Sequence, residues 1–175
     1  MRALAAKLEQ ICRVTGRAVA WLCLAMVIVT GIVVVDRYVF NSGSIRLQES
    51  VTFMHAVVFM LAAGYTLAAG DHVRVDVFYG SMSARGRALV DLLGSLLLLF
   101  PFCLFILWSS WDFVSVSWSI REASQEAGGL PYPFLPLMKS CIPLTMILLM
   151  LQGCSMILTS IATLAEASGD PSGVN

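Results

Sequence analysis

Charged side chains are scarce in this sequence, and their scarcity excludes an ordinary soluble domain. Only 13% of the 175 residues are Asp, Glu, Lys or Arg, and 58% are hydrophobic, whereas soluble domains carry roughly 25% charged residues. Eleven basic residues balance eleven acidic ones, so the formal net charge is zero. Without a basic surplus the chain lacks the charge that holds a phosphate backbone, and we expect no nucleic-acid partner.

Charges are missing altogether from four long stretches, which indicates membrane-spanning helices. These stretches cover residues 18–35, 50–70, 92–111 and 140–165. A helix crosses a bilayer core in roughly 20 apolar residues and satisfies its own backbone hydrogen bonds in lipid. The stretches lack the alternation of barrel strands. We therefore predict an all-α integral membrane protein, a single four-helix membrane domain over residues 1–175, with spans near 18–39, 48–70, 90–112 and 140–165.

The basic residues outside the spans predict the orientation. Four of them precede the first span, as in a signal peptide, but the apolar run is longer than a signal-peptide core and ends at Asp36-Arg37-Tyr38 instead of a cleavage site. We interpret it as a retained helix, preceded by an N-terminal tail. With the N-terminus inside, seven Lys and Arg residues lie on the inner side and four on the outer side. This bias predicts that both termini are cytoplasmic.

Aromatic residues lie at the expected span edges, where an indole or phenol ring places its apolar body in lipid and its polar group near water. The alternative is that they are core aromatics. The residues concerned are Trp21 at the inner edge and Tyr38, Phe40, Trp108 and Trp111 at the outer edge, with Trp118 beyond them.

Small residues at a spacing of four predict helix packing faces, because membrane helices associate by close approach. The second span carries Ala62, Thr66 and Gly70, with Gly64 and Ala68 in an adjacent row, and the fourth span carries Ser155, Thr159 and Thr163. The neighbouring helix belongs either to this chain or to a partner.

The outer loop, residues 113–139, begins with a sequence pattern that fits either a helix or a strand. Apolar residues from Phe113 to Ala127 follow helical spacing, and those from Val114 to Ile120 also alternate like a strand. We favour a helix that continues from the third span and ends at Gly128-Gly129. The LPYPFLP segment that follows is expected to be extended. Pro101 is expected to bend the third span, and Pro143 to lie in the first turns of the fourth.

The usual residues of membrane catalysis are missing. The five cysteines form no CxxC pair, which argues against a disulfide-oxidising enzyme. The two histidines, His55 and His72, are 17 residues apart, or roughly 25 Å along a helix, so they cannot clamp one haem. We expect no enzyme activity, no cofactor and no metal site. Two alternatives remain: an independent small transporter that uses His55 as a proton or substrate contact, and a four-helix membrane redox enzyme, which the missing residues disfavour. The other interpretation of His55 is an interfacial histidine bonded to a neighbouring helix.

The stretch from Gln48 to Leu93, QESVTFMHAVVFMLAAGYTLAAGDHVRVDVFYGSMSARGRALVDLL, resembles the small membrane subunit (DctQ-type) of tripartite ATP-independent periplasmic (TRAP) transporters. The resemblance rests on a glutamate at the entry to the second span, here Glu49. A small-residue helix and a Gly-x-His-x-x-x-Asp-like segment follow, here GDHVRVD. The later WSIREASQEAGGLPYPFLPLMKSCIPL is similar to the outer loop of the family, in its branch for mannitol, chloroaromatic or 2-oxo acid uptake.

The resemblance implies a scaffold subunit in the bacterial inner membrane. It would pack against a large membrane subunit that carries the substrate and sodium sites, and it would help dock a periplasmic solute-binding protein that delivers an organic acid. Within that frame we expect Glu49 to cap the second helix or contact a partner. A charged cluster would fix the inner loop through Asp71, His72, Arg74 and Asp76, and the outer residues that would touch the binding protein are Arg121, Glu122 and Glu126. For both groups the alternative is a plain solvated surface.

Overall fold

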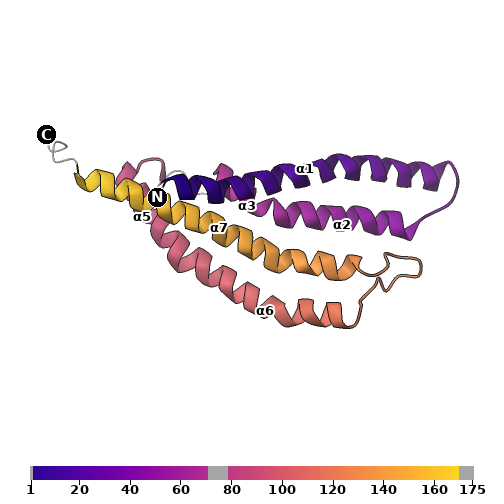
Figure 1. Ribbon diagram of the computed structural model, residues 1–175. Helices are drawn as coiled ribbons and strands as arrows, with labels where there is room; N and C mark the ends of the chain where they lie inside the picture. The colour runs from indigo at the N-terminus through magenta and orange to yellow at the C-terminus, as the bar shows by residue number, and fades with distance from the viewer. Residues whose placement is uncertain (1, 71–78, 170–175) are drawn as a thin grey trace.

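The computed structural model describes residues 2–70 and 79–169. Within these residues the chain is helical without strands, and four helical segments lie side by side (Figure 1). Each segment is long and apolar enough to cross a membrane, and the four cover Arg2–Tyr38, Ile45–Ala69, Ala84–Ser119 and Phe134–Glu166. The all-α fold with four candidate spans is confirmed. The beginning of the first helix and the end of the last helix lie at the same end of the bundle (Figure 1).

The first helix, α1 (Arg2–Tyr38), begins sixteen residues before the predicted span. The segment before residue 18, expected to be a tail, is therefore helical. At 1.5 Å per residue the helix is about 55 Å long, well above the roughly 30 Å of a bilayer core. Its buried residues Ala5, Cys12 and Val19 recur every seven residues and so lie on one face. The segment packs through this face, and its charged residues are not confined to the opposite side, since Glu9 and Arg13 are half-buried.

The second span divides into α2 (Ile45–Leu61) and α3 (Ala63–Ala69). Ala62 between them keeps right-handed helical torsions, and its N–H donates to Val58 O at 3.0 Å, so the path is almost continuous. Ser44 caps α2 by accepting a hydrogen bond from the Leu47 N–H. The expectation that Glu49 caps this helix is wrong, because Ser44 holds that position and Glu49 lies one turn further in.

The third span consists of α5 (Ala84–Gly94), a π-helical turn η1 (Ser95–Leu99) and α6 (Phe100–Ser119). The wide π turn directly precedes Pro101, whose ring cannot fit against the carbonyl four residues earlier in a regular α-helix. The segment bends along its length (Figure 1), as expected for Pro101. The loop begins as a helix, as predicted, but α6 ends at Ser119 and not at Gly128-Gly129.

The fourth helix, α7 (Phe134–Gly169), begins inside the segment expected to be extended. Only the first part of LPYPFLP is non-helical, and Pro136 lies in the first turn of α7. A proline is tolerated there because the first N–H groups of a helix have no helical acceptor. Pro143 lies inside α7, in its third turn.

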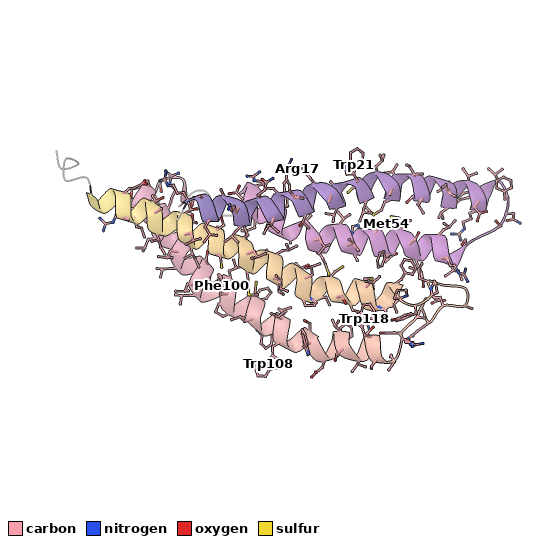
Figure 2. The ribbon with its side chains drawn as sticks, viewed as in Figure 1. Arg17, Trp21, Met54, Phe100, Trp108 and Trp118 are labelled. Atoms are coloured by element: carbon pink, nitrogen blue, oxygen red, sulfur yellow. The ribbon has the colours of Figure 1, made fainter. Side chains whose placement is uncertain are left out.

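Helix α7 is the centre of the bundle. It contacts every other helix, and 39% of its most apolar window is buried, against 6%, 6% and 11% for the other three spans. Most of the apolar surface of α1 and α6 faces outward. Trp21 on α1 and Trp108 on α6 project away from the bundle on opposite sides (Figure 2) and are 73% and 84% exposed. The core-aromatic interpretation is therefore wrong for these two residues.

Candidate functional site

The outer loop is fastened to the second span through Glu49. Its Oε1 accepts a hydrogen bond from Ser124 Oγ, and its Oε2 accepts one from the Leu130 N–H at 2.6 Å. The loop closes on itself, because the Ser124 N–H donates to Leu130 O at 3.0 Å. Gly129 completes the contact, since a Cβ there would lie 2.7 Å from Glu49 Oε2. A carboxylate on α2 thus holds two loop residues 75 and 81 positions away.

A second contact joins the end of α6 to the start of α7. Glu122 Oε2 accepts hydrogen bonds from Lys139 Nζ at 2.5 Å and from Ser117 Oγ at 2.6 Å. Lys139 Nζ also lies 4.1 Å from the centroid of the Phe113 ring. The side chains of the ion pair are only 16% and 21% exposed. We call the two contacts together the outer-loop clamp; its members are Glu49, Ser117, Glu122, Ser124, Leu130 and Lys139.

The hydrogen bond from Lys139, together with that from Ser117, holds the pKa of the Glu122 carboxyl below its ordinary value of 4.5. Because the folded-state pKa is the lower one, ionised Glu122 stabilises the clamp at pH values above the ordinary carboxyl pKa. This contribution is lost as the pH falls through the lowered folded-state value.

We expect Glu122→Gln to lower the melting temperature at pH 7 and to have a smaller effect at an acidic pH below the lowered folded-state pKa, where wild-type Glu122 is also neutral. Thermal unfolding of the purified chain at both pH values measures this. Glu126→Gln is the matched control, because Glu126 is exposed and has no side-chain hydrogen bond within the described residues. An equal loss at both pH values would contradict the assigned role of the Glu122 charge.

Of the outer residues expected to touch a partner, Arg121 and Glu126 are exposed and Glu122 is not. Arg121 adopts a positive φ of 51° at the turn that ends α6. Two charges of the loop are therefore available at the surface, whereas the third is used within the chain.

The predicted packing row on the second span is only partly buried. Ala62 and Thr66 are half-buried, and the Thr66 hydroxyl donates within its own helix, to Ala63 O at 2.9 Å. Gly70 is exposed and ends α3 with a left-handed φ of 77°. The adjacent row makes the close contact, because a Cβ on Gly64 would lie 3.2 Å from Leu148 Cβ on α7. The remaining predicted residues, Asp71, His72, Arg74 and Asp76, lie outside the described residues.

His55 is exposed, and its ring stacks on Phe59 of the same helix at a centroid distance of 6.4 Å. The five cysteines are free thiols. Among the residues that the model describes, no group of three or more His, Cys, Asp or Glu side chains is placed to hold a metal ion.

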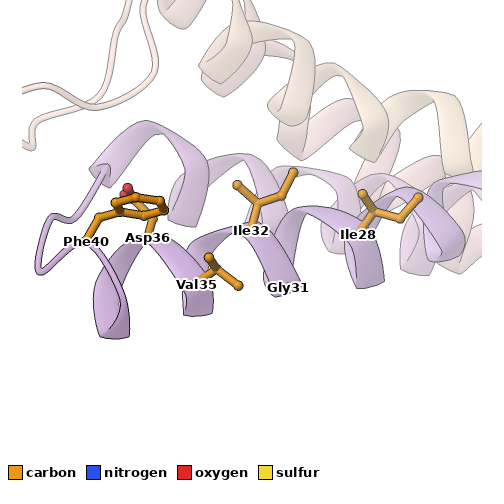
Figure 3. Close-up of a pocket in the computed structure, with 6 residues that line it drawn as sticks. All are labelled: Ile28, Gly31, Ile32, Val35, Asp36 and Phe40. Atoms are coloured by element: carbon orange, nitrogen blue, oxygen red, sulfur yellow. The ribbon is translucent and has the colours of Figure 1, made fainter.

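A shallow apolar hollow of about 380 Å³ runs along the outer half of α1 (Figure 3). Its wall includes Ile28, Ile32, Val35 and Phe40, and Gly31 deepens it because the glycine has no side chain. Asp36 lies at one end and accepts a hydrogen bond from Ser42 Oγ at 2.6 Å. The hollow belongs to one helix and the turn after it, so it is a surface groove and not a chamber between helices.

Sequence reasoning missed the two loop partners of Glu49. Ser124 and Leu130 have no local signal for this role, since only the folded loop brings them to α2. The buried face of the N-terminal segment did have a signal, the seven-residue spacing of Ala5, Cys12 and Val19.

The model of the family described as tripartite ATP-independent periplasmic transporters, DctQ component, matches residues 4–163. No curated protein matches the chain significantly. The matched range includes all four candidate spans almost completely and the whole outer-loop clamp.

Proposed function

We propose that this chain, which belongs to the DctQ component family of tripartite ATP-independent periplasmic transporters, is a non-catalytic scaffold in a sodium-driven importer. The chain is the small membrane subunit of such a system. In the proposal it packs against the large membrane subunit in the inner membrane of a bacterium, and the solute is an organic acid delivered by a periplasmic binding protein.

The observation that carries the proposal is how closely the helices approach one another. Gly16 leaves no room for a side chain, because a Cβ there would clash with the Cβ of Tyr65. Two more glycines make close contacts, since a Cβ on Gly64 would lie 3.2 Å from Leu148 Cβ and a Cβ on Gly153 would lie 2.8 Å from Leu99 Cδ2. Transporters that work alone generally place their substrate near the midplane between discontinuous helices. A bundle packed through glycines at three helix contacts is better suited to hold a partner in place.

The position of His55 does not favour the alternative of an independent transporter. A proton or substrate contact is expected to face the bundle interior or a water-filled cavity. His55 instead faces outward and stacks on Phe59. Three ionic groups of the outer end, Glu49, Glu122 and Lys139, are engaged in the outer-loop clamp, which holds the loop to the helices.

Individual residues receive roles within this proposal. Arg121 and Glu126, exposed on the clamped loop, face the periplasmic binding protein. Ala62 and Thr66 contribute to the contact with the large subunit through the part of their surface that this chain leaves uncovered. Glu49 acts on the partner indirectly, by fixing the loop.

Co-expression with the large subunit of the proposed complex tests the proposal. We expect a tag on this chain to recover the large subunit in detergent, because the two would form one membrane complex. A tag on an unrelated four-helix membrane protein serves as the control. Recovery of the chain without the large subunit, when both are present in the membrane, would refute the scaffold role.

A further inference from the structure

The uncharged stretches of neighbouring helices do not lie at the same level along the bundle. Near the beginning of α1, Ala5 O accepts a hydrogen bond from Ser155 Oγ at 2.9 Å. Two turns further on, Cys12 Sγ donates to Leu148 O at 3.4 Å. Both partners belong to the uncharged stretch 140–165 of α7. The charged N-terminal half of α1 therefore runs along the uncharged part of its neighbour.

An upright bundle would bring a charge of α1 into lipid. Lys7 lies between these two contacts and is exposed, at the level of residues 148–155 in the middle of the uncharged stretch of α7. If the bundle axis stood along the membrane normal with this stretch in lipid, Lys7 would lie near the bilayer midplane, where a lysine is strongly disfavoured. The uncharged stretch of α1 itself, residues 18–35, continues past the beginning of α7 (Figure 1). An upright crossing would leave most of it outside lipid.

The uncharged stretch of the third span, residues 92–111, lies instead at the level of that of α7. At one end Asp91, just before the stretch, lines a shared hollow with Ser160. At the other end Trp118, beyond the stretch, donates from Nε1 to Ser140 Oγ at 2.9 Å. The stretch lies between these two contacts, so the third span and α1 are offset from each other along the bundle.

Two exposed tryptophans show the offset directly. Trp21 follows the beginning of the uncharged stretch of α1, and Trp108 precedes the end of that of the third span. Both spans run toward the outer loop, so an upright bilayer requires Trp108 to lie nearer the outer loop than Trp21. Figure 2 shows the reverse order. The two stretches can share one bilayer only if its plane is inclined to the bundle axis.

We propose that the bundle crosses the bilayer obliquely. Lipid covers the half of α1 that is nearer the outer loop and, on the other side of α7, η1 and the first half of α6. The inclined plane leaves the charged N-terminal half of α1 in water. Arg17 lies at the boundary and is exposed, and its long side chain can reach the headgroups. The proposal concerns this chain in lipid and does not rest on the scaffold role.

Exposed apolar side chains lie where this crossing requires them. Val27, at the centre of the α1 stretch, is 69% exposed, and Phe102, at the centre of the third-span stretch, is 57% exposed. The length of α7 agrees as well. Its uncharged stretch 140–165 is about 39 Å long at 1.5 Å per residue, and a span longer than the roughly 30 Å hydrocarbon core fits by tilting.

Spin labels on single cysteines measure the depth of each site when the purified full chain is placed in lipid nanodiscs. The background chain carries alanine in place of the exposed Cys23 and the half-buried Cys154, and its signal without an added cysteine is the control. Oxygen concentrates at the bilayer midplane, whereas a nickel chelate stays in water. We expect Val27→Cys and Phe102→Cys to show the same high ratio of oxygen to nickel accessibility, and Lys7→Cys to be several-fold more accessible to nickel.

An upright bundle cannot place both Val27 and Phe102 at the midplane, because they lie at different levels along its axis. A water-exposed label at Val27→Cys with a deep label at Phe102→Cys would therefore overturn the proposal, and so would a deep label at Lys7→Cys. A Lys7→Cys label hidden from both probes would show that a second copy of the chain covers this half of α1, which would overturn it as well. Leu24→Cys and Phe105→Cys, at sites 53% and 66% exposed, repeat the comparison if either of the first pair misfolds.

Discussion

Gly16→Ala is expected to destabilise the bundle, whereas Gly31→Ala in the same helix is expected to be neutral or stabilising. A Cβ on Gly16 would lie 2.5 Å from Tyr65 Cγ and closer still to Tyr65 Cβ. The Tyr65 Cβ is fixed to the backbone of α3, so the clash cannot be relieved by rotating a flexible side chain. The two helices would have to separate, and overpacking of this kind costs roughly 1–3 kcal/mol.

The Gly31→Ala control separates the effect of the clash from the effect of helix propensity, because alanine is favoured over glycine inside a helix by about 1 kcal/mol. Nothing lies within 4 Å of a Cβ placed on Gly31, so only that benefit remains there. Thermal unfolding of both variants in detergent measures the difference, and each kcal/mol corresponds to roughly 2–4 °C in a chain of this size. Equal melting temperatures for the two variants would contradict the close contact between α1 and α3.

Glu49→Gln is expected to release the outer loop without unfolding the helices. Glutamine keeps the shape of the side chain but replaces one acceptor oxygen by an NH₂ group. The NH₂ group would face either the Ser124 hydroxyl or the Leu130 N–H. The hydroxyl can turn to accept a hydrogen bond from it, but the N–H cannot, because it is itself a donor. The charge that strengthens both hydrogen bonds is lost as well.

Hydrogen exchange followed by mass spectrometry measures the release. We expect peptides covering residues 120–133 to exchange several-fold faster in Glu49→Gln, with unchanged exchange in the centre of α7. Glu126→Gln, on the same loop but outside the clamp, is expected to exchange like the wild type. If Glu49→Gln also exchanges like the wild type, Glu49 does not hold the loop.

The uncharged stretches predicted the helices well because lipid admits few charges, so composition alone marks the spans. The same reasoning misread the segment before residue 18, where Lys7, Arg13 and Arg17 suggested a tail. Counting charges does not show that the same helix also has an apolar packing face, which here carries Ala5 and Cys12.

Longer-range features were harder to predict. Spacing of four in the second span gave two rows of small residues, one through Thr66 and one through Gly64, and only tertiary packing against Leu148 distinguishes them. The resemblance drew attention to Glu49, but its partners Ser124 and Leu130 depend on how the loop folds.

Purification of the complex tests the central claim most directly. The tagged chain is co-expressed with the large subunit of the proposed complex, extracted in mild detergent and passed over a size-exclusion column. The eluted mass and subunit ratio are then measured. The scaffold account predicts one peak that contains both subunits in a fixed ratio. A peak of this chain alone, with the large subunit folded and eluting separately, would contradict it.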